Sequence, residues 1–172
     1  MHRLRILAAA VPFAAAVLLA AAAAPARAGD PPYLKLAQEL GTPQLLDSAG
    51  PDDKSRLLLH FIPDGEDGKT WTKMTTISIL KVAEADTDTA LRGVIGQLRD
   101  ALKERHAEIE AFDESPLAPV SCFFEFSVDD EADRGVVYSP NPGFVTVAQY
   151  ALRTGQAMDP DALKLIKSLA GR

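Results

Sequence analysis

The segment from residue 120 to residue 128 constrains the fold of this 172-residue chain more than any other stretch. Every second residue in it is apolar, and these residues are Val120, Cys122, Phe124, Phe126 and Val128. The residues between them are Ser121, Phe123, Glu125 and Ser127. Side chains alternate between the two faces of a β-strand, so this pattern predicts a strand with one face in the core. The chain must therefore build a sheet around it.

Two further β-like segments flank an acidic loop. Residues 57–62 form an apolar run that only His60 interrupts, and residues 71–81 are rich in Thr and Ile, which favour strands. Between them, Pro63 has no N–H for a strand ladder, and the Asp64-Gly65 and Asp67-Gly68 dipeptides are typical of turns. A loop of this length is compatible with antiparallel pairing.

Helices are expected at residues 33–40, at residues 85–112 and after residue 159. The long helix carries an apolar stripe at helical spacing, formed by Leu91, Val94, Ile95, Leu98, Leu102, Ile109 and Phe112. Its interior glycines, Gly93 and Gly96, indicate either close approach of the backbone to a sheet or a frayed first turn. For the last helix, Asp159 is expected to cap the N-terminus, followed by Pro160 at the first helical position.

The order of these elements predicts an α+β fold. Strands at residues 135–138 and 144–152 are expected to continue from the 120–128 strand as an antiparallel meander, while residues 44–54 are expected to form a turn-rich connection. The result is an antiparallel sheet of about five strands with helices packed on its faces, an α/β/α sandwich. Residues 29–172 are expected to form one domain.

Residues 1–28 have the pattern of a secretory signal. Arg3 and Arg5 form a short basic region, residues 6–24 are almost entirely apolar, and Ala26-Arg27-Ala28 presents small residues for cleavage. Cleavage near Ala28 would place the protein in the periplasm or outside the cell. The alternative is an uncleaved membrane anchor, because the apolar stretch is long enough to span a bilayer.

Charge excludes some partners. Cleavage would remove Arg3, Arg5 and Arg27 and no acid, so the formal net charge would change from −6 to −9. Nucleic acid and anionic membrane surfaces are poor partners for such a chain, and no stable membrane anchor is expected after cleavage. The single cysteine, Cys122, is expected to be a small buried hydrophobe rather than a catalytic thiol.

No motif specifies a reaction. The sequence lacks the Gly-x-Ser-x-Gly elbow of α/β hydrolases and any glycine-rich phosphate or dinucleotide loop. His106 is expected on the solvated side of the long helix. The acidic loops at residues 64–68 and 129–133 lack the ligand spacing of a calcium site, and the histidines and the cysteine do not form a zinc set. We therefore expect no cofactor and no metal.

Three residues are candidate contacts for a ligand or partner: His60, Trp71 and Glu125. His60 interrupts an apolar strand before the acidic loop, where it is either a histidine satisfied by a neighbour or a titrating group beside Asp64, Glu66 and Asp67. Trp71 either packs under the loop or offers its N–H to a partner. Glu125 must be solvated or paired, and it is a possible companion of His60 in a polar pocket.

The element order resembles the fold shared by the photosystem II protein PsbP, a Ran-binding nuclear import factor and mycobacterial secreted lipoproteins. The stretch Phe61-Ile62-Pro63-Asp64-Gly65, followed by Trp71-Thr72-Lys73-Met74-Thr75-Thr76, is also similar to a pattern in small secreted bacterial proteins of unknown function. The closing segment Val147–Arg153 and the final helix fit the same plan. The resemblance implies a binding or accessory protein and carries over no functional residue.

Three functions are expected from these observations, and one of them, an envelope-stress or virulence-associated interaction protein, has the same sequence features as the first. The first is an exported, non-catalytic binding or accessory protein whose partner is an unknown protein or small molecule. The second is a small periplasmic hydrolase that uses His60 with acidic neighbours. A deep polar pocket that joins His60 to Glu125 would favour the hydrolase, and a wide separation would count against it.

Overall fold

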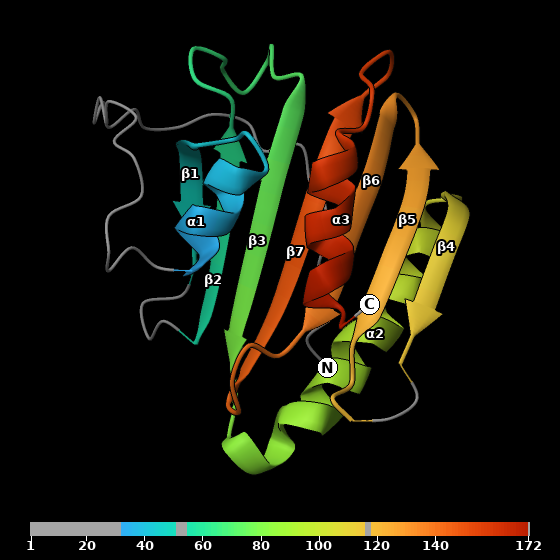
Figure 1. Cartoon of the computed structure of the whole chain (residues 1–172). Coiled ribbons are helices and arrows are strands. Elements are labelled where there is room, and N and C mark those ends of the chain that lie inside the picture. The colour runs from blue at the N-terminus through green and yellow to red at the C-terminus, as the bar shows by residue number, and fades with distance from the viewer. Residues whose placement is uncertain (1–31, 51–54, 116–117, 172) are drawn as a thin grey trace.

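The structure is a computed structural model, and it describes residues 32–50, 55–115 and 118–171 (Figure 1). The predicted signal and its cleavage site lie outside these residues. The elements in chain order are α1 (Pro32–Glu39), β1 (Gln44–Ala49), β2 (Arg56–Ile62), β3 (Lys73–Lys81), a 3-10 turn (Glu84–Asp86), α2 (Thr87–Glu104), β4 (Glu108–Glu114), β5 (Cys122–Val128), β6 (Glu131–Tyr138), β7 (Phe144–Arg153) and α3 (Pro160–Leu169). Among them, no helix is both long and apolar enough to cross a membrane.

The described strands form one antiparallel sheet of seven, in the order β1-β2-β3-β7-β6-β5-β4. The chain forms β1, β2 and β3 as a meander, crosses through α2 to the far edge, and returns strand by strand from β4 to β7. The last strand then pairs with β3 from Lys73↔Leu152 to Lys81↔Phe144. The two halves of the sheet therefore meet at its centre.

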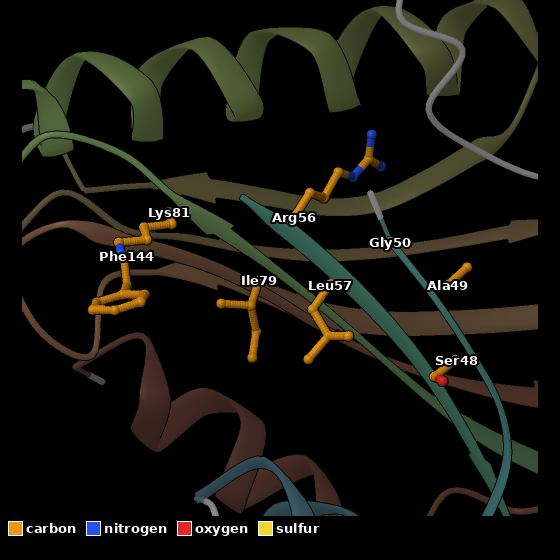
Figure 2. Close-up of a pocket in the computed structure, with 8 residues that line it drawn as sticks. All are labelled: Ser48, Ala49, Gly50, Arg56, Leu57, Ile79, Lys81 and Phe144. Atoms are coloured by element: carbon orange, nitrogen blue, oxygen red, sulfur yellow. The ribbon is translucent and has the colours of Figure 1, made fainter. Parts of the chain in front are cut away.

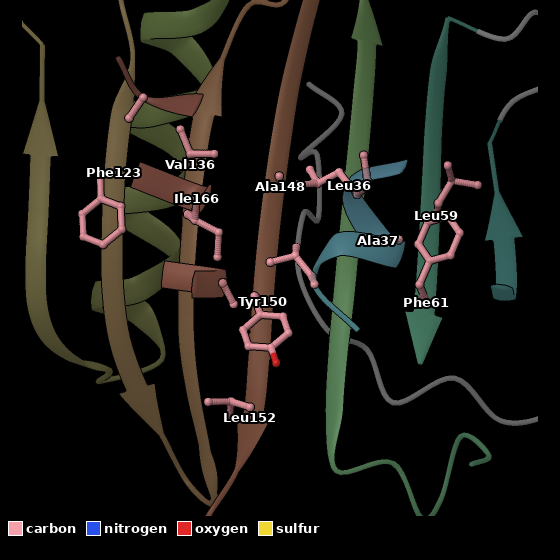
Figure 3. Close-up of a cluster of buried hydrophobic side chains, with 14 residues drawn as sticks. Leu36, Ala37, Leu59, Phe61, Phe123, Val136, Ala148, Tyr150, Leu152 and Ile166 are labelled. Carbon is pink, nitrogen blue, oxygen red and sulfur yellow. The ribbon is translucent and has the colours of Figure 1, made fainter. Parts of the chain in front are cut away.

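Helices cover both faces of this sheet, with α1 and α3 on one side and α2 on the other (Figure 1). Under α1 and α3, Phe61, Val136 and Tyr150 of the sheet pack with Leu36 and Ile166 of the helices (Figure 3). We call this the α1/α3 face. On the opposite, α2 face, the core contains Leu91, Ile95, Leu98 and Leu102 of α2 with Cys122, Phe124, Phe126, Val137 and Val145 of the sheet.

The predicted α+β sandwich with an antiparallel sheet is confirmed, but the predicted count of about five strands is too low. One missed strand is β1, in a stretch expected to be turn-rich. Its pairing with β2 shifts register between Leu45 and Asp47. This irregularity breaks the simple alternation by which a strand is recognised in a sequence.

The other missed strand is β4, which lies in the second half of the predicted long helix. The helix ends at Glu104, and His106 adopts a left-handed conformation with φ 54°. The N–H of His106 donates to the carbonyl of Lys103, and that of Ala107 donates to Leu102, which together close the helix. His106 therefore follows the helix rather than lying on its outer face. Ile109 and Phe112 fit the helical stripe by spacing, but both belong to β4.

The close approach to a sheet that was one explanation of the two helix glycines is also wrong. A Cβ atom added at Gly93 or Gly96 would have no neighbour within 4 Å, so no close backbone approach explains them. By contrast, the predicted cap of the last helix is confirmed, because Asp159 Oδ1 accepts from the Asp161 N–H at 2.9 Å and Pro160 is the first helical residue. The helix at residues 33–40 and the strand ending at Val128 are confirmed as α1 and β5.

Candidate functional site

His60 projects from β2 onto the α2 face of the sheet and is 28% exposed. Its Nδ1 lies 3.0 Å from Oγ1 of Thr76, the residue opposite it on β3. Its Nε2 lies 4.0 Å from Oδ1 of Asp47 on β1, again the directly opposite residue. The expected acidic companions Asp64, Glu66 and Asp67 are not the carboxylates paired with His60. The missed strand β1 provides that carboxylate.

The arrangement of Asp47, His60 and Thr76 is a carboxylate, an imidazole and a hydroxyl in line, the order found in nucleophilic hydrolases. Two features weaken it as a catalytic set. The contact between Asp47 and His60 is long for a hydrogen bond. Thr76 lies within a central strand that pairs with β2 and β7, so its neighbouring backbone N–H groups are committed to the ladders and none is free to bind an oxyanion.

Glu125 lies far from His60 and on the other face. Residues paired across neighbouring strands project to the same face of the sheet. Starting from His60, the successive partners on β3, β7, β6 and β5 are Thr76, Gln149, Gly135 and Phe124. Glu125 is the next residue after Phe124, so it projects to the α1/α3 face. Three strands separate β2 from β5, a distance of roughly 19 Å at ordinary strand spacing. The two residues share no pocket.

Glu125 is instead satisfied by its own cross-strand partner. Arg134 Nε donates to Glu125 Oε1 at 2.6 Å, and Arg134 Nη2 lies 3.8 Å from Glu110 Oε2. Both side chains of the first pair are largely covered. Glu125 thus belongs to a small ion-pair network over β4, β5 and β6, which is a structural role.

Trp71 is buried, with 7% of its surface exposed. Its indole packs against Ile62 and Ala151, and the guanidinium of Arg153 lies 4.6 Å from the ring centroid. The ring therefore anchors the loop that precedes β3 on the sheet and leaves little surface for a partner.

The acidic loop at residues 64–68 uses its carboxylates internally. Glu66 accepts from the N–H and the hydroxyl of Thr72, both at 2.7 Å. Asp67 Oδ1 accepts from the N–H groups of Lys69 and Thr70, and these bonds hold the pKa of Asp67 below its usual range. Over the described ranges of the chain, no three His, Cys, Asp or Glu side chains are grouped so that they would hold a metal ion.

The second acidic stretch contains a residue that the sequence placed wrongly. Asp133 was expected in a turn, but it lies within β6, is only 2% exposed and accepts from Gln149 Nε2 at 2.7 Å. Burial raises the pKa of this carboxyl to about 6, and the Gln149 hydrogen bond opposes part of that shift. The turn itself consists of Asp129 and Asp130.

A half-open groove of about 570 Å³ lies near one end of the sheet (Figure 2). Leu57, Ile79 and Phe144 project into it on the side of α1 and α3, whereas Arg56 points to the opposite side. Lys81 lies directly across the ladder from Phe144. The remaining lining residues are Ser48, Ala49 and Gly50.

Local contacts fix the position of Phe144. The preceding Gly143 has φ +87° and is held on two sides: its N–H donates to Thr87 Oγ1 at 2.8 Å, and its carbonyl accepts from the Val82 N–H at 2.9 Å. Phe144 is nevertheless 38% exposed, one of three large apolar side chains so exposed in the described ranges. A fixed and exposed aromatic ring in an apolar groove is suited to binding an apolar group.

Sequence reasoning did not identify this groove. Phe144 begins a strand whose first residues, Phe144 and Val145, are both apolar, so the pattern does not show which side is open. Leu57 and Ile79 were predicted only as residues of two β-like segments.

No protein-family model matches this sequence, and no curated protein matches it. Among solved structures, the chain is similar to the solution structure of cyanobacterial PsbP (CyanoP) from Synechocystis sp. PCC 6803. The identity is 13%, the match covers 74% of this chain and 90% of that one, and the TM-score is 0.35. A TM-score this low describes a partial overlap of two folds, and nothing about the function of this chain follows from it.

Proposed function

We propose that this protein is an exported binding or accessory protein without catalytic activity, and that the groove at Phe144 is its binding site. The observation that supports this best is the exposed Phe144 ring beside Leu57 and Ile79 in a groove of about 570 Å³. That volume lies in the range of small-molecule sites, which are mostly apolar with a few polar groups. The PsbP-like architecture that the sequence resembles and a periplasmic or secreted location after cleavage near Ala28 belong to the same proposal.

The binding site is tested with N-phenyl-1-naphthylamine, an uncharged fluorophore whose emission rises in apolar surroundings. Phe144→Ala is expected to weaken its binding at least threefold. Ile109→Ala is the matched control, because Ile109 is 40% exposed, close to the 38% of Phe144, but lies on β4 at the far edge of the sheet. Equal effects of the two substitutions, or no binding to the unmodified protein, would contradict the proposal.

The hydrolase remains the second candidate because Asp47, His60 and Thr76 lie in line. It predicts turnover of p-nitrophenyl acetate that both His60→Ala and Thr76→Val abolish. The non-catalytic proposal predicts that release of p-nitrophenol is the same for both variants and the unmodified protein. Thr76→Val keeps the shape of the side chain while removing the hydroxyl, so a loss of turnover in that variant would point to chemistry rather than misfolding.

A further inference from the structure

We infer that the groove binds an anionic amphiphile, a molecule with one alkyl chain and a carboxylate head, and that Lys81 binds the head. This inference rests on the proposed function, since it names the ligand class for the same groove. It follows from the shape of the groove, the chemistry of its floor and the position of one cation at its rim.

The floor of the groove suits an alkyl chain. Ser48, Leu57 and Ile79 lie on the neighbouring strands β1, β2 and β3, and Phe144 lies on β7, so the lining crosses four adjacent strands. At ordinary strand spacing this width is roughly 14 Å. Its floor is apolar, formed by Leu57, Ile79 and Phe144 (Figure 2). A long and narrow apolar ligand fits such a strip better than a compact polar one does.

One end of the strip carries a cation. Lys81 pairs with Phe144 in the ladder between β3 and β7, so both side chains project from the same face of the sheet. Lys81 is exposed, and no carboxylate of the described residues forms a salt bridge with it. Arg56 also lines the groove, but its guanidinium points to the other side of the sheet (Figure 2).

Charge complementarity with Lys81 then indicates that the head group of the ligand is anionic. The chain as a whole is acidic, with a formal net charge of −6. A lysine that has no salt-bridge partner among the described residues, at the end of an apolar strip, therefore attracts an anion. An ammonium group binds a carboxylate as a point charge and needs no second donor. An uncharged amphiphile would be bound only by its contacts with the apolar floor. A free molecule is inferred rather than a lipid surface, because an acidic protein is repelled by anionic membranes.

The test displaces N-phenyl-1-naphthylamine with dodecanoate and, separately, with dodecanol, both below the concentrations at which they aggregate. Dodecanoate is expected to bind more tightly than dodecanol. Lys81→Gln is expected to weaken the binding of dodecanoate about fivefold, which corresponds to the upper range for an exposed ion pair. The same substitution should leave the affinity for dodecanol unchanged. Arg56→Gln is the matched control and should change neither the affinity for dodecanoate nor that for dodecanol. Raising the salt concentration should weaken the binding of dodecanoate but not that of dodecanol.

The outcomes separate this inference from the proposed function. If dodecanoate and dodecanol displace the fluorophore equally, or if Lys81→Gln and Arg56→Gln weaken dodecanoate equally, the assignment of Lys81 is wrong while the groove remains a binding site. If neither molecule displaces the fluorophore and the fluorophore itself does not bind, the proposed function fails. Binding to phosphatidylglycerol vesicles without binding to free dodecanoate would overturn the choice of a free ligand.

Discussion

Gln149 Nε2, on β7, donates a hydrogen bond to Asp133 Oδ1, on β6, at 2.7 Å. Among the described residues, this is the side-chain hydrogen bond that the Asp133 carboxylate accepts. The carboxyl is almost fully buried, and burial raises its pKa to about 6 from an ordinary value of 3.8. One amide donor does not replace the water that an ionised carboxylate loses. Asp133 therefore makes stability depend on pH.

The sign of this dependence follows from the raised pKa. The folded protein binds the Asp133 proton more tightly than the unfolded chain does, so the contribution to stability is complete below about pH 3.8 and is lost as the pH rises through about 6. Asp133→Asn removes the ionisation. We expect it to raise the free energy of unfolding by about 1 to 3 kcal/mol at pH 7.5 and to have little effect at pH 4. Urea unfolding at the two pH values measures this.

The control for Asp133 is Asp130→Asn in the adjoining turn, where the side chain is exposed. It should leave the stability difference between pH 4 and pH 7.5 unchanged. If Asp133→Asn keeps the pH dependence of the unmodified protein, the buried carboxyl is not its source.

Helix α2 is expected to gain stability from alanine at two positions. Gly93 and Gly96 lie in the helix interior, and a Cβ atom at either site meets no neighbour within 4 Å. Each substitution to alanine should therefore raise the free energy of unfolding by about 1 kcal/mol. Gly135→Ala is the contrasting case, because its Cβ would collide with the Phe124 ring and lie 2.6 Å from the Ala148 carbonyl oxygen. We expect a loss of about 1 to 3 kcal/mol there, measured by chemical denaturation.

The pair of Glu125 and Arg134 is expected to stabilise the sheet rather than serve a reaction. Arg134→Ala leaves a largely covered carboxylate with its main partner removed, which should cost about 1.5 to 3 kcal/mol. Glu125→Gln should cost less, because the amide oxygen still accepts from Arg134. A double-mutant cycle measures the coupling directly. A coupling near zero would show that the two groups are solvated separately despite their 2.6 Å contact.

The cap of α3 gives a further test. Asp159→Ala removes the acceptor of the Asp161 N–H and should lower the free energy of unfolding by about 1 kcal/mol. Asp161→Asn keeps that N–H and changes only a charge near the helix N-terminus, so we expect a smaller loss of about 0.5 kcal/mol. Thermal unfolding of the two variants at the same pH compares them. An equal loss in both would mean that charge, and not the capping bond, stabilises this terminus.

The sequence predicted those elements whose pattern is both local and regular. The alternation that ends at Val128 and the sequence Asp159-Pro160 identified β5 and α3 because neighbouring residues alone decide them. β1 and β4 were missed for physical reasons. A register shift between Leu45 and Asp47 obscures the first. In the second, Ile109 and Phe112 have helical spacing, and they share a face of the strand only because the pairing shifts register between Ile109 and Ala111. In both, pairing with the next strand along the chain, and not the pattern within the segment itself, decides the outcome.

The candidate site was harder to predict than the fold. His60 and Glu125 were considered as companions because both interrupt apolar strands, yet the strand order places them on different faces with three strands between them. Which carboxylate lies near His60 depends on β1, which was not expected to be a strand. The groove beside Phe144 is lined by residues from four strands, β1, β2, β3 and β7, so it is a property of the assembled sheet rather than of any motif.

The pairing of β3 with β7 has a consequence for how the chain folds. These central partners are separated by 63 to 79 residues in sequence, whereas every other ladder joins consecutive strands. Contacts between such distant segments slow folding, because a large loop must close before they form. We expect each half of the sheet to assemble first, leaving a bare hydrogen-bonding edge on β3 until the final strand docks. During that interval the molecule is most vulnerable to aggregation.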